Sequence, residues 1–357
     1  MDPLCPCGRQ KLIADTRIWL ALVLTVTNRL RMPQLQNGLQ QILQIYHAPN
    51  RTHPATPTWV EGFSDGVIPV QCHSHNDYWR RVPLYEGLAA GCVGTEADIW
   101  VGNTTDGHID LFVGHDAKSL SPSRTLRSLY LDPLVGILTR QNSISPENPT
   151  LTAGAPGSSS ASPVGVFSVA PDTSLILLLD FKTASSATWD AVVAQLDNIR
   201  AGGWLTRWTP TEGIVERPLT IVASGKAAFD AVTGNATYRD IFYDAPLIEL
   251  SDANTPFNVN NSYYASASLR NAVGTIAFEN LRASQKSRVA TQVQRASELG
   301  LRSRYWDTPS WPVGWRNKIW TFLVEEGASV LNVDDLTAAA RWDWQMCIIG
   351  GLNICNA

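Results

Sequence analysis

Residues 67–357 alternate short apolar runs with amphipathic stretches, and this alternation constrains the fold more than any other feature. The runs at 175–182 and 219–225 have the length and apolar content of buried strands. The stretches at 186–203 and 280–300 have helical periodicity and end at glycine. Strands that alternate with helices form parallel sheets with helical crossovers. Roughly eight such units predict an α/β fold, a (β/α)8 TIM barrel, with a doubly wound open sheet as the alternative.

The rest of the chain predicts its domain organisation. Residues 1–66 lack the alternation and predict an N-terminal leader and linker with one short helix, which leaves residues 67–357 as a single barrel domain. Within that domain, residues 143–174 are rich in Ser, Pro, Gly and Ala, which predicts a surface insertion. We also expect a helix over 125–142 with a kink at Pro133, a strand over 241–250, and a hairpin through 103–107.

The leader contains an apolar run, IWLALVLTV at 18–26, that follows Lys11 and Arg17. The run is shorter than a transmembrane span and resembles the apolar region of a signal peptide or a short signal anchor. Four N-x-S/T sequons also fit the secretory route, at Asn50, Asn103, Asn235 and Asn260. We therefore expect an extracellular or membrane-associated protein rather than a cytosolic one.

The six cysteines include no C-x2-C pair of the kind that binds zinc. Cys72 and Cys92 flank the first two expected strands and are candidates for a disulfide, and Cys347 and Cys355 form a second candidate pair. Buried free thiols are the alternative in both cases. The formal net charge is −4, the sequence pI is about 5.9, and no patch is rich in Lys or Arg, so nucleic acid is not an expected partner.

Polar residues gather where the expected strands end, which is where TIM barrels place their functional groups. Glu96 and Asp98 are two positions apart in one apolar run, so they point to the same face of a strand. Like charges held that close are costly unless a cation or proton lies between them. Asp180 ends a third strand and would complete a set of three oxygen ligands, which favours one divalent ion, Mg2+ or Ca2+. Lys182, two residues further on, would hold an anion beside that ion.

Histidines at the ends of two strands would act as general base and general acid across a shared substrate. His115 is one of them, and the other is His73 or His75. Two histidines, a lysine and a divalent ion suit phosphoryl transfer. A rival interpretation is an amidohydrolase-like zinc enzyme, because H-x-H at 73–75 also marks that class. No histidine follows His115, however, so such a site would lack its later ligands.

A set of motifs in this order resembles a known family. The motifs are HSHNDY at 73–78, PLYEGLAAG at 83–91, EADIW at 96–100, VGHD at 113–116, TLRSLYLDPL at 125–134, DFK at 180–182, YWDTP at 305–309 and LNVDDL at 331–336. Over roughly residues 67–337 the chain resembles the fungal altered-inheritance-of-mitochondria type proteins, which are placed among the PLC-like phosphodiesterases. The resemblance implies a TIM barrel and kinship with glycerophosphodiester phosphodiesterases and sphingomyelinase D-like phospholipases.

The same resemblance implies roles for individual residues. The H-x-x-N pattern of the sphingomyelinase D-like proteins is matched by His73 and Asn76, so we favour His73 over His75 as the first catalytic histidine. Their metal-binding and substrate-binding positions are matched by Glu96, Asp98, His115, Asp180 and Lys182, and Trp306 resembles an aromatic near the substrate. The H-R-G element of the glycerophosphodiesterases is absent, which argues against that substrate.

The expected function is therefore a metal-dependent phosphoric diester hydrolase or lyase that acts on a phospholipid or glycerophosphodiester. A membrane surface is a further candidate partner. A barrel that binds a phosphate or lipid without catalysis is the alternative function.

Overall fold

The computed structural model describes residues 37–46, 59–143, 162–276, 281–341, 348–349 and 352–353. The apolar run at 18–26, Asn50, Cys347 and Cys355 lie outside them. Among the helices that the structure describes, none has both the length and the hydropathy needed to cross a bilayer.

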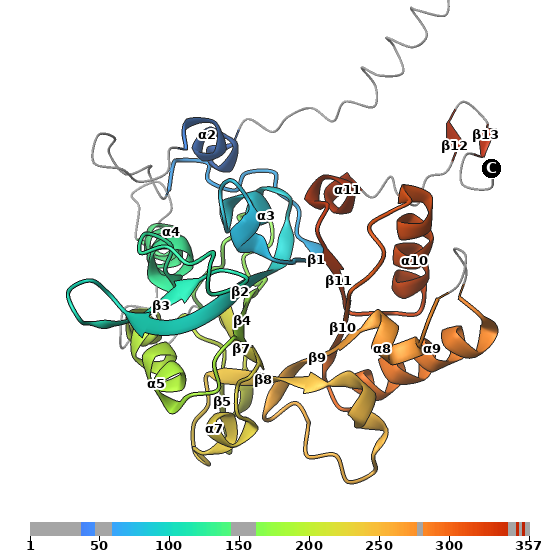
Figure 1. Cartoon of the computed structure of the whole chain (residues 1–357). Coiled ribbons are helices and arrows are strands. Elements are labelled where there is room, and N and C mark those ends of the chain that lie inside the picture. The colour runs from blue at the N-terminus through green and yellow to red at the C-terminus, as the bar shows by residue number, and fades with distance from the viewer. Residues whose placement is uncertain are drawn as a thin grey trace, which may run out of the picture. The chain divides into compact units, whose positions relative to one another are not determined.

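Eight parallel strands pair side by side and close into a barrel, with helices around the outside of the ring (Figure 1). Closure depends on the first strand, which pairs with both the second and the last strand of the ring. The (β/α)8 TIM barrel expected from the sequence is therefore confirmed. In chain order the barrel strands are β1 (Val70–Ser74), β2 (Cys92–Asn103), β4 (Leu175–Phe181), β7 (Leu219–Gly225), β8 (Ile241–Pro246), β9 (Ser262–Ser268), β10 (Arg302–Trp306) and β11 (Val330–Val333).

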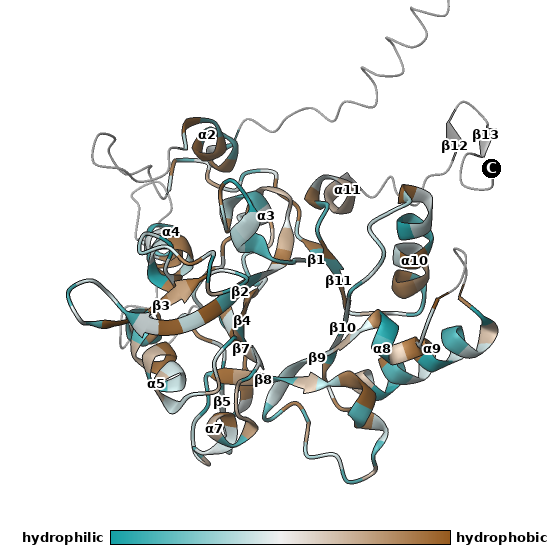
Figure 2. Ribbon diagram, viewed as in Figure 1, coloured by the Kyte–Doolittle hydropathy of each residue, from teal (hydrophilic) through white to brown (hydrophobic). Residues whose placement is uncertain are grey.

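The crossover helices follow the strands, and α10 carries both apolar and polar residues because one of its faces packs on the barrel (Figure 2). The helices are α2 (Gly38–Ile45), α3 (Tyr85–Ala89), α4 (Asp132–Gln141), α5 (Ser186–Gln195), α6 (Asp197–Ala201), α7 (Phe229–Thr233), α8 (Leu269–Val273), α9 (Ala283–Glu298), α10 (Val313–Glu325) and α11 (Leu336–Arg341). Two further hairpins are β5 (Arg207–Thr209) with β6 (Gly213–Val215), and β12 (Ile348–Ile349) with β13 (Leu352–Asn353).

The period-two alternation along each strand divides its side chains between two cores. On β4, Leu177 and Leu179 pack outward against the helices, whereas Ile176 and Leu178 pack inside the barrel. The next residue on the inner face is Asp180, at the carboxyl end of the strand. The apolar inner layers therefore fill the lower part of the barrel, and the same alternation carries polar groups into its mouth.

Several details of the sequence prediction are confirmed and others are wrong. β2 and β3 (Ile109–Val113) form the expected antiparallel hairpin. The expected strand over 241–250 is wrong in its second half, because β8 ends at Pro246 and a 3-10 helix, η3 (Leu247–Ser251), follows. Proline has no N–H to extend the ladder, which explains this end.

The helix expected over 125–142 begins as a π-helical turn, η2 (Arg127–Leu131), before α4. Pro133 is the second residue of α4, directly after the π-helical turn, and the Asp132 N–H before it donates to the Arg127 carbonyl. The change from π to α geometry therefore coincides with the proline at which we expected a kink.

Segments expected to be peripheral contribute to the core. Leu39 and Ile42 of α2 are fully buried against the barrel, and the Asn37 side chain caps this helix by accepting from the Gln40 amide. Val166 and Phe167 are also buried, so the expectation of a surface insertion is wrong for this part of 143–174. Residues 144–161 lie outside the described residues.

Cys72 and Cys92 form a disulfide that links β1 to β2, with the two Cα atoms 4.7 Å apart. Both side chains are buried between the strands and the helices. The disulfide therefore ties together the two strands that carry a histidine and two carboxylates at their carboxyl ends.

Removing this disulfide should lower the free energy of unfolding by about 3 kcal/mol, because it closes a loop of about 20 residues in the unfolded chain. Urea titrations of Cys72→Ala, Cys92→Ala and the double variant measure this change. We expect each single variant to lose nearly as much as the double variant, since either change removes the whole bond. Additive losses of a few tenths of a kcal/mol would contradict the pairing.

Candidate active site

Three carboxylates meet at the mouth of the barrel because two neighbouring strands are in register. Asp98 of β2 lies beside Asp180 of β4, and Glu96 lies one step deeper on the same face of β2. One oxygen from each of the three lies within 4.8 Å of the others. The pair that spacing alone placed on one face therefore converges with a third acid, in an arrangement that suits a divalent cation.

Lys182 is the cation nearest to this cluster. Its Nζ lies 2.8 Å from Asp98 Oδ2 and 2.5 Å from Asp180 Oδ2. Burial lowers the pKa of Lys182, but hydrogen bonds to the two aspartates outweigh it and raise the pKa above its usual value. The other oxygen of Asp98, Oδ1, is buried and has no hydrogen-bond partner, so the donor set fits a further positive charge.

Asp98 is the most buried of the three acids, and Tyr78 fixes its position. The Tyr78 hydroxyl lies 2.8 Å from Asp98 Oδ2 and 2.7 Å from Asn76 Oδ1, so its single proton is shared between these two acceptors. Burial, followed by the charge of Glu96, raises the pKa of Asp98 to about 6. The backbone of Asn76 adopts a left-handed conformation with φ 47°, and its backbone N–H donates to Glu96 Oε2.

His75 lies at the mouth, directly after β1. Its Nδ1 is 2.8 Å from Asp334 Oδ1, and its Nε2 is 3.9 Å from Glu96 Oε2. Burial lowers the pKa of His75, but the hydrogen bond to Asp334 and the charge of Glu96 raise it overall. His75 is therefore oriented by a carboxylate and presents its other nitrogen to the cluster.

His73 does not lie at the mouth, so the geometry favours His75 over our choice of His73 as the first catalytic histidine. His73 is fully buried inside the barrel, one inward position below His75, and its ring packs edge-on against Tyr264. Burial, followed by the charge of Arg304, holds the pKa of His73 well below its usual value. A substrate at the carboxylate cluster would meet His75 first, so the extra histidine of the motif is the one that reaches the site.

His115 reaches the cluster from the turn that follows β3. Its Nδ1 lies 3.5 Å from Asp98 Oδ2 and 3.2 Å from the Tyr78 hydroxyl, and half of its side chain is exposed. The Trp79 ring packs beside it with centroids 5.1 Å apart. His75 and His115 therefore approach the carboxylates from two different segments of the chain.

The remaining expected residues lie near the mouth with different contacts. Asn76 contacts Glu96 and Tyr78 as described above. Trp306 ends β10 with 40% of its surface exposed, and it is not among the residues that contact the carboxylate cluster. His108 lies on the β2–β3 turn, 3.8 Å from Asp106 and away from the carboxylates. The two histidines in the first part of the chain, at 47 and 53, lie outside the described residues.

Sequence reasoning assigned no role to three residues that build the site. Tyr78 lies in a 3-10 turn, η1 (Asp77–Trp79), where strand alternation carries no information. Asp334 follows β11, and its place at a strand end marked it as one of the polar groups near the mouth without showing its contact with His75. Gly225 ends β7 with φ 65°, and an added Cβ would lie 1.8 Å from Asp180 Oδ1, so only glycine leaves room for that carboxylate.

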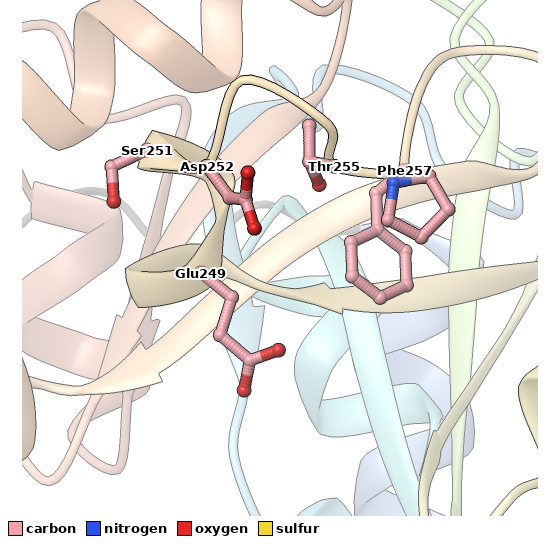
Figure 3. Close-up of a pocket in the computed structure, with 6 residues that line it drawn as sticks. Glu249, Ser251, Asp252, Thr255 and Phe257 are labelled. Carbon is pink, nitrogen blue, oxygen red and sulfur yellow. The ribbon is translucent and has the colours of Figure 1, made fainter.

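A separate hollow lies between η3 and β9 (Figure 3). It is lined by carboxylate, hydroxyl and aromatic side chains, and none of the site residues discussed above lines it. Its lining residues are Glu249, Ser251, Asp252, Thr255, Pro256 and Phe257.

Comparison with known proteins identifies the family. The model of the AIM6-like phosphodiesterase domain matches residues 61–244. The chain belongs to this family. The altered inheritance of mitochondria protein 6 homolog of Arthroderma benhamiae is 36% identical over 283 residues, covering 77% of this chain and 84% of the relative. The altered inheritance of mitochondria protein 6 of Eremothecium gossypii is 33% identical over 289 residues, covering 78% and 70%.

Membership of the AIM6-like family agrees with the resemblance seen in the sequence. The matched range includes β1, β2 and β4, and therefore all three carboxylates, Lys182, His75 and His115. No solved structure matches the chain. The family assignment supports a phosphodiesterase type of domain, and the geometry shows an acidic triad that could bind a divalent metal.

Replacing Gly225 by alanine should displace Asp180 and weaken metal binding at least about tenfold, because the new Cβ would overlap its carboxylate. Gly213→Ala is the matched control, since Gly213 also has a positive φ, 68°, but has no atom near the added Cβ. Both variants should lose about 1 kcal/mol of stability to backbone strain. Calorimetric titration with Mg2+ separates them, and equal affinities would contradict the role of Gly225.

Metal binding should weaken below about pH 6, because a proton on Asp98 competes with the cation. The affinity should be constant above about pH 7 and fall by up to about tenfold per pH unit below pH 6. Titration with Mg2+ at several pH values tests this. Asp98→Asn should bind more weakly throughout with a flatter pH dependence, and an unchanged wild-type affinity at about pH 5 would contradict the assignment.

Proposed function

We propose that the protein is a metal-dependent phosphoric diester hydrolase or lyase that acts on a phospholipid or glycerophosphodiester. One observation carries the proposal: two imidazoles, His75 and His115, approach a cluster of three carboxylates and a lysine at one barrel mouth. The family description as a phosphodiesterase domain supports the same reaction class.

Glu96, Asp98 and Asp180 would hold one divalent ion, Mg2+ or Ca2+. When bound, the ion would neutralise charge on the phosphate oxygens. Lys182 already bonds two of these acids, so in the loaded site it would share their charge and attract a further phosphate oxygen.

The two histidines would move the protons. The raised pKa of His75 favours the imidazolium form, which donates a proton, so we assign it to the oxygen of the leaving group. His115 would then accept the proton of the attacking hydroxyl while the new P–O bond forms. With water as nucleophile the product is a phosphomonoester, and with a hydroxyl of the substrate it is a cyclic phosphate.

The proposal extends to the secretory route. The disulfide between Cys72 and Cys92 is typical of proteins that fold in an oxidising compartment. The sequon residues Asn103, Asn235 and Asn260 are all exposed, as glycan acceptors must be.

Turnover of phosphodiester lipids should require Mg2+ and both histidines at the mouth. We expect His75→Ala and His115→Ala to lower the rate by about 10²–10⁴-fold, since each removes one proton transfer. His108→Ala is the matched control, because this exposed histidine lies away from the carboxylates. Phosphorus NMR of a lipid screen, with the metal present and then chelated, measures the rate and distinguishes cyclic from linear products.

Normal activity in either mouth variant would contradict the assignment. Absence of turnover on every phosphodiester, combined with tight Mg2+ binding, would favour the non-catalytic barrel instead. Two bound zinc ions by metal analysis would revive the amidohydrolase-like alternative.

A further inference from the structure

Three of the tryptophans that the structure describes are strongly exposed, and these three lie at the carboxyl end of the barrel. Trp79 follows β1 and is 62% exposed, Trp306 ends β10 and is 40% exposed, and Trp311 precedes α10 and is 74% exposed. β10, β11 and β1 are consecutive in the ring, so the three tryptophans follow the ends of neighbouring strands. We call these residues the tryptophan arc. Val313, also exposed, extends it at the start of α10.

An exposed tryptophan is unusual on the surface of a soluble protein, because its large ring forgoes the favourable free energy that burial would provide. Among the described residues, every strongly exposed aromatic belongs to this arc. Tryptophan combines an apolar ring with a polar N–H, and it is enriched where protein meets the boundary between lipid chains and head groups. The composition of the arc therefore fits a lipid surface.

The charges around the arc favour an electrically neutral surface. The described segments that join β9 to α9, β10 to α10, β11 to α11 and β1 to α3 carry four arginines and three aspartates outside the core, so their charges nearly cancel. These residues are Arg80, Arg81, Arg270, Arg282, Asp307, Asp334 and Asp335. A surface that binds anionic lipid through charge needs a cluster of unbalanced basic groups, and an excess of one arginine does not supply it. The charge of this surface therefore suits a membrane of zwitterionic lipids.

The spacing of the arc also distinguishes a bilayer from a protein partner. Its tryptophans stand on two connections, one after β1 and one after β10, with the polar residues Asp334 and Asp335 after the intervening strand β11. A stable protein partner needs about 800 Å² of continuous complementary surface on each side. A fluid bilayer accepts separate apolar side chains without such complementarity.

We propose that the tryptophan arc docks the barrel mouth onto a zwitterionic lipid bilayer. Trp79 packs beside His115, so the docking surface is continuous with the candidate active site. In this orientation a phosphodiester head group could reach the carboxylates while its chains stay in the membrane. The inference extends the proposed function by naming where the substrate is presented, but the docking itself does not require turnover.

Binding of the full chain to phosphatidylcholine vesicles, measured by flotation with the divalent metal chelated, tests the docking. We expect the wild type to float with the vesicles at both low and high salt. The double variant Trp311→Ala/Val313→Ala should bind at least about tenfold more weakly. Ile68→Ala is the matched control, since Ile68 is 72% exposed but precedes β1 at the opposite end of the barrel.

Three results would overturn the proposal: no binding of the wild type, equal binding of the double variant, or binding that needs anionic lipid and disappears at high salt. A catalytically inactive protein that still floats through the tryptophan arc would refute the proposed function alone. An active protein that fails to float would refute the docking alone. Hydrolysis of a soluble short-chain phosphodiester by the double variant should match the wild type, because Trp311 and Val313 are not among the residues that contact the carboxylates.

Discussion

Mutual repulsion among Glu96, Asp98 and Asp180 is the constraint on which the rest of the site depends. The register between β2 and β4 forces Asp98 and Asp180 side by side, and neither backbone can move without breaking the closed ring. Lys182 offsets part of the repulsion, yet burial and Glu96 still raise the pKa of Asp98 to about 6. Ionised Asp98 therefore lowers stability at neutral pH in the metal-free protein, and this penalty diminishes as the pH falls toward the ordinary value of an aspartate. A bound cation would relieve the same strain.

The barrel was predictable from the alternation of strands with helices, and the carboxylates from the period of two along each strand. Alternation along a buried strand places Glu96 and Asp98 on one face, and parallel strands in a barrel bring Asp180 to the same end. The run LILLLDF is apolar on both faces until Asp180, so the sequence alone marks where the apolar layers stop. The disulfide was only a candidate, because Cys72 and Cys92 flank the first two expected strands and their spacing left free thiols open. The register pairs Cys92 with Val70, two residues before Cys72.

The choice between His73 and His75 was not predictable, because both occupy the inner face of one strand. Their difference is one of depth, and depth is set by the tilt and stagger of the closed barrel rather than by the local sequence. Pairing of His73 with Gly94 and Asn332 places it below the mouth, where Tyr264 crosses the interior. Tyr78 was missed for a related reason. Its hydroxyl reaches Asp98 only because Asn76 adopts a left-handed conformation that turns the chain back over the strand ends.

The turn after β1 lies between the proposed catalytic groups and the exposed tryptophans. All the proposed acid, base and ligand groups come from β1, β2, β4 and the turn after β3, whereas Trp306 and Trp311 stand over β10. Tyr78 and Trp79 are adjacent in the chain, but the first points to Asp98 and the second lies exposed against His115. The Trp79 ring packs beside His115 with centroids 5.1 Å apart. Contact of Trp79 with a lipid surface would therefore restrain the ring next to His115, which links docking to the position of a proposed catalytic group.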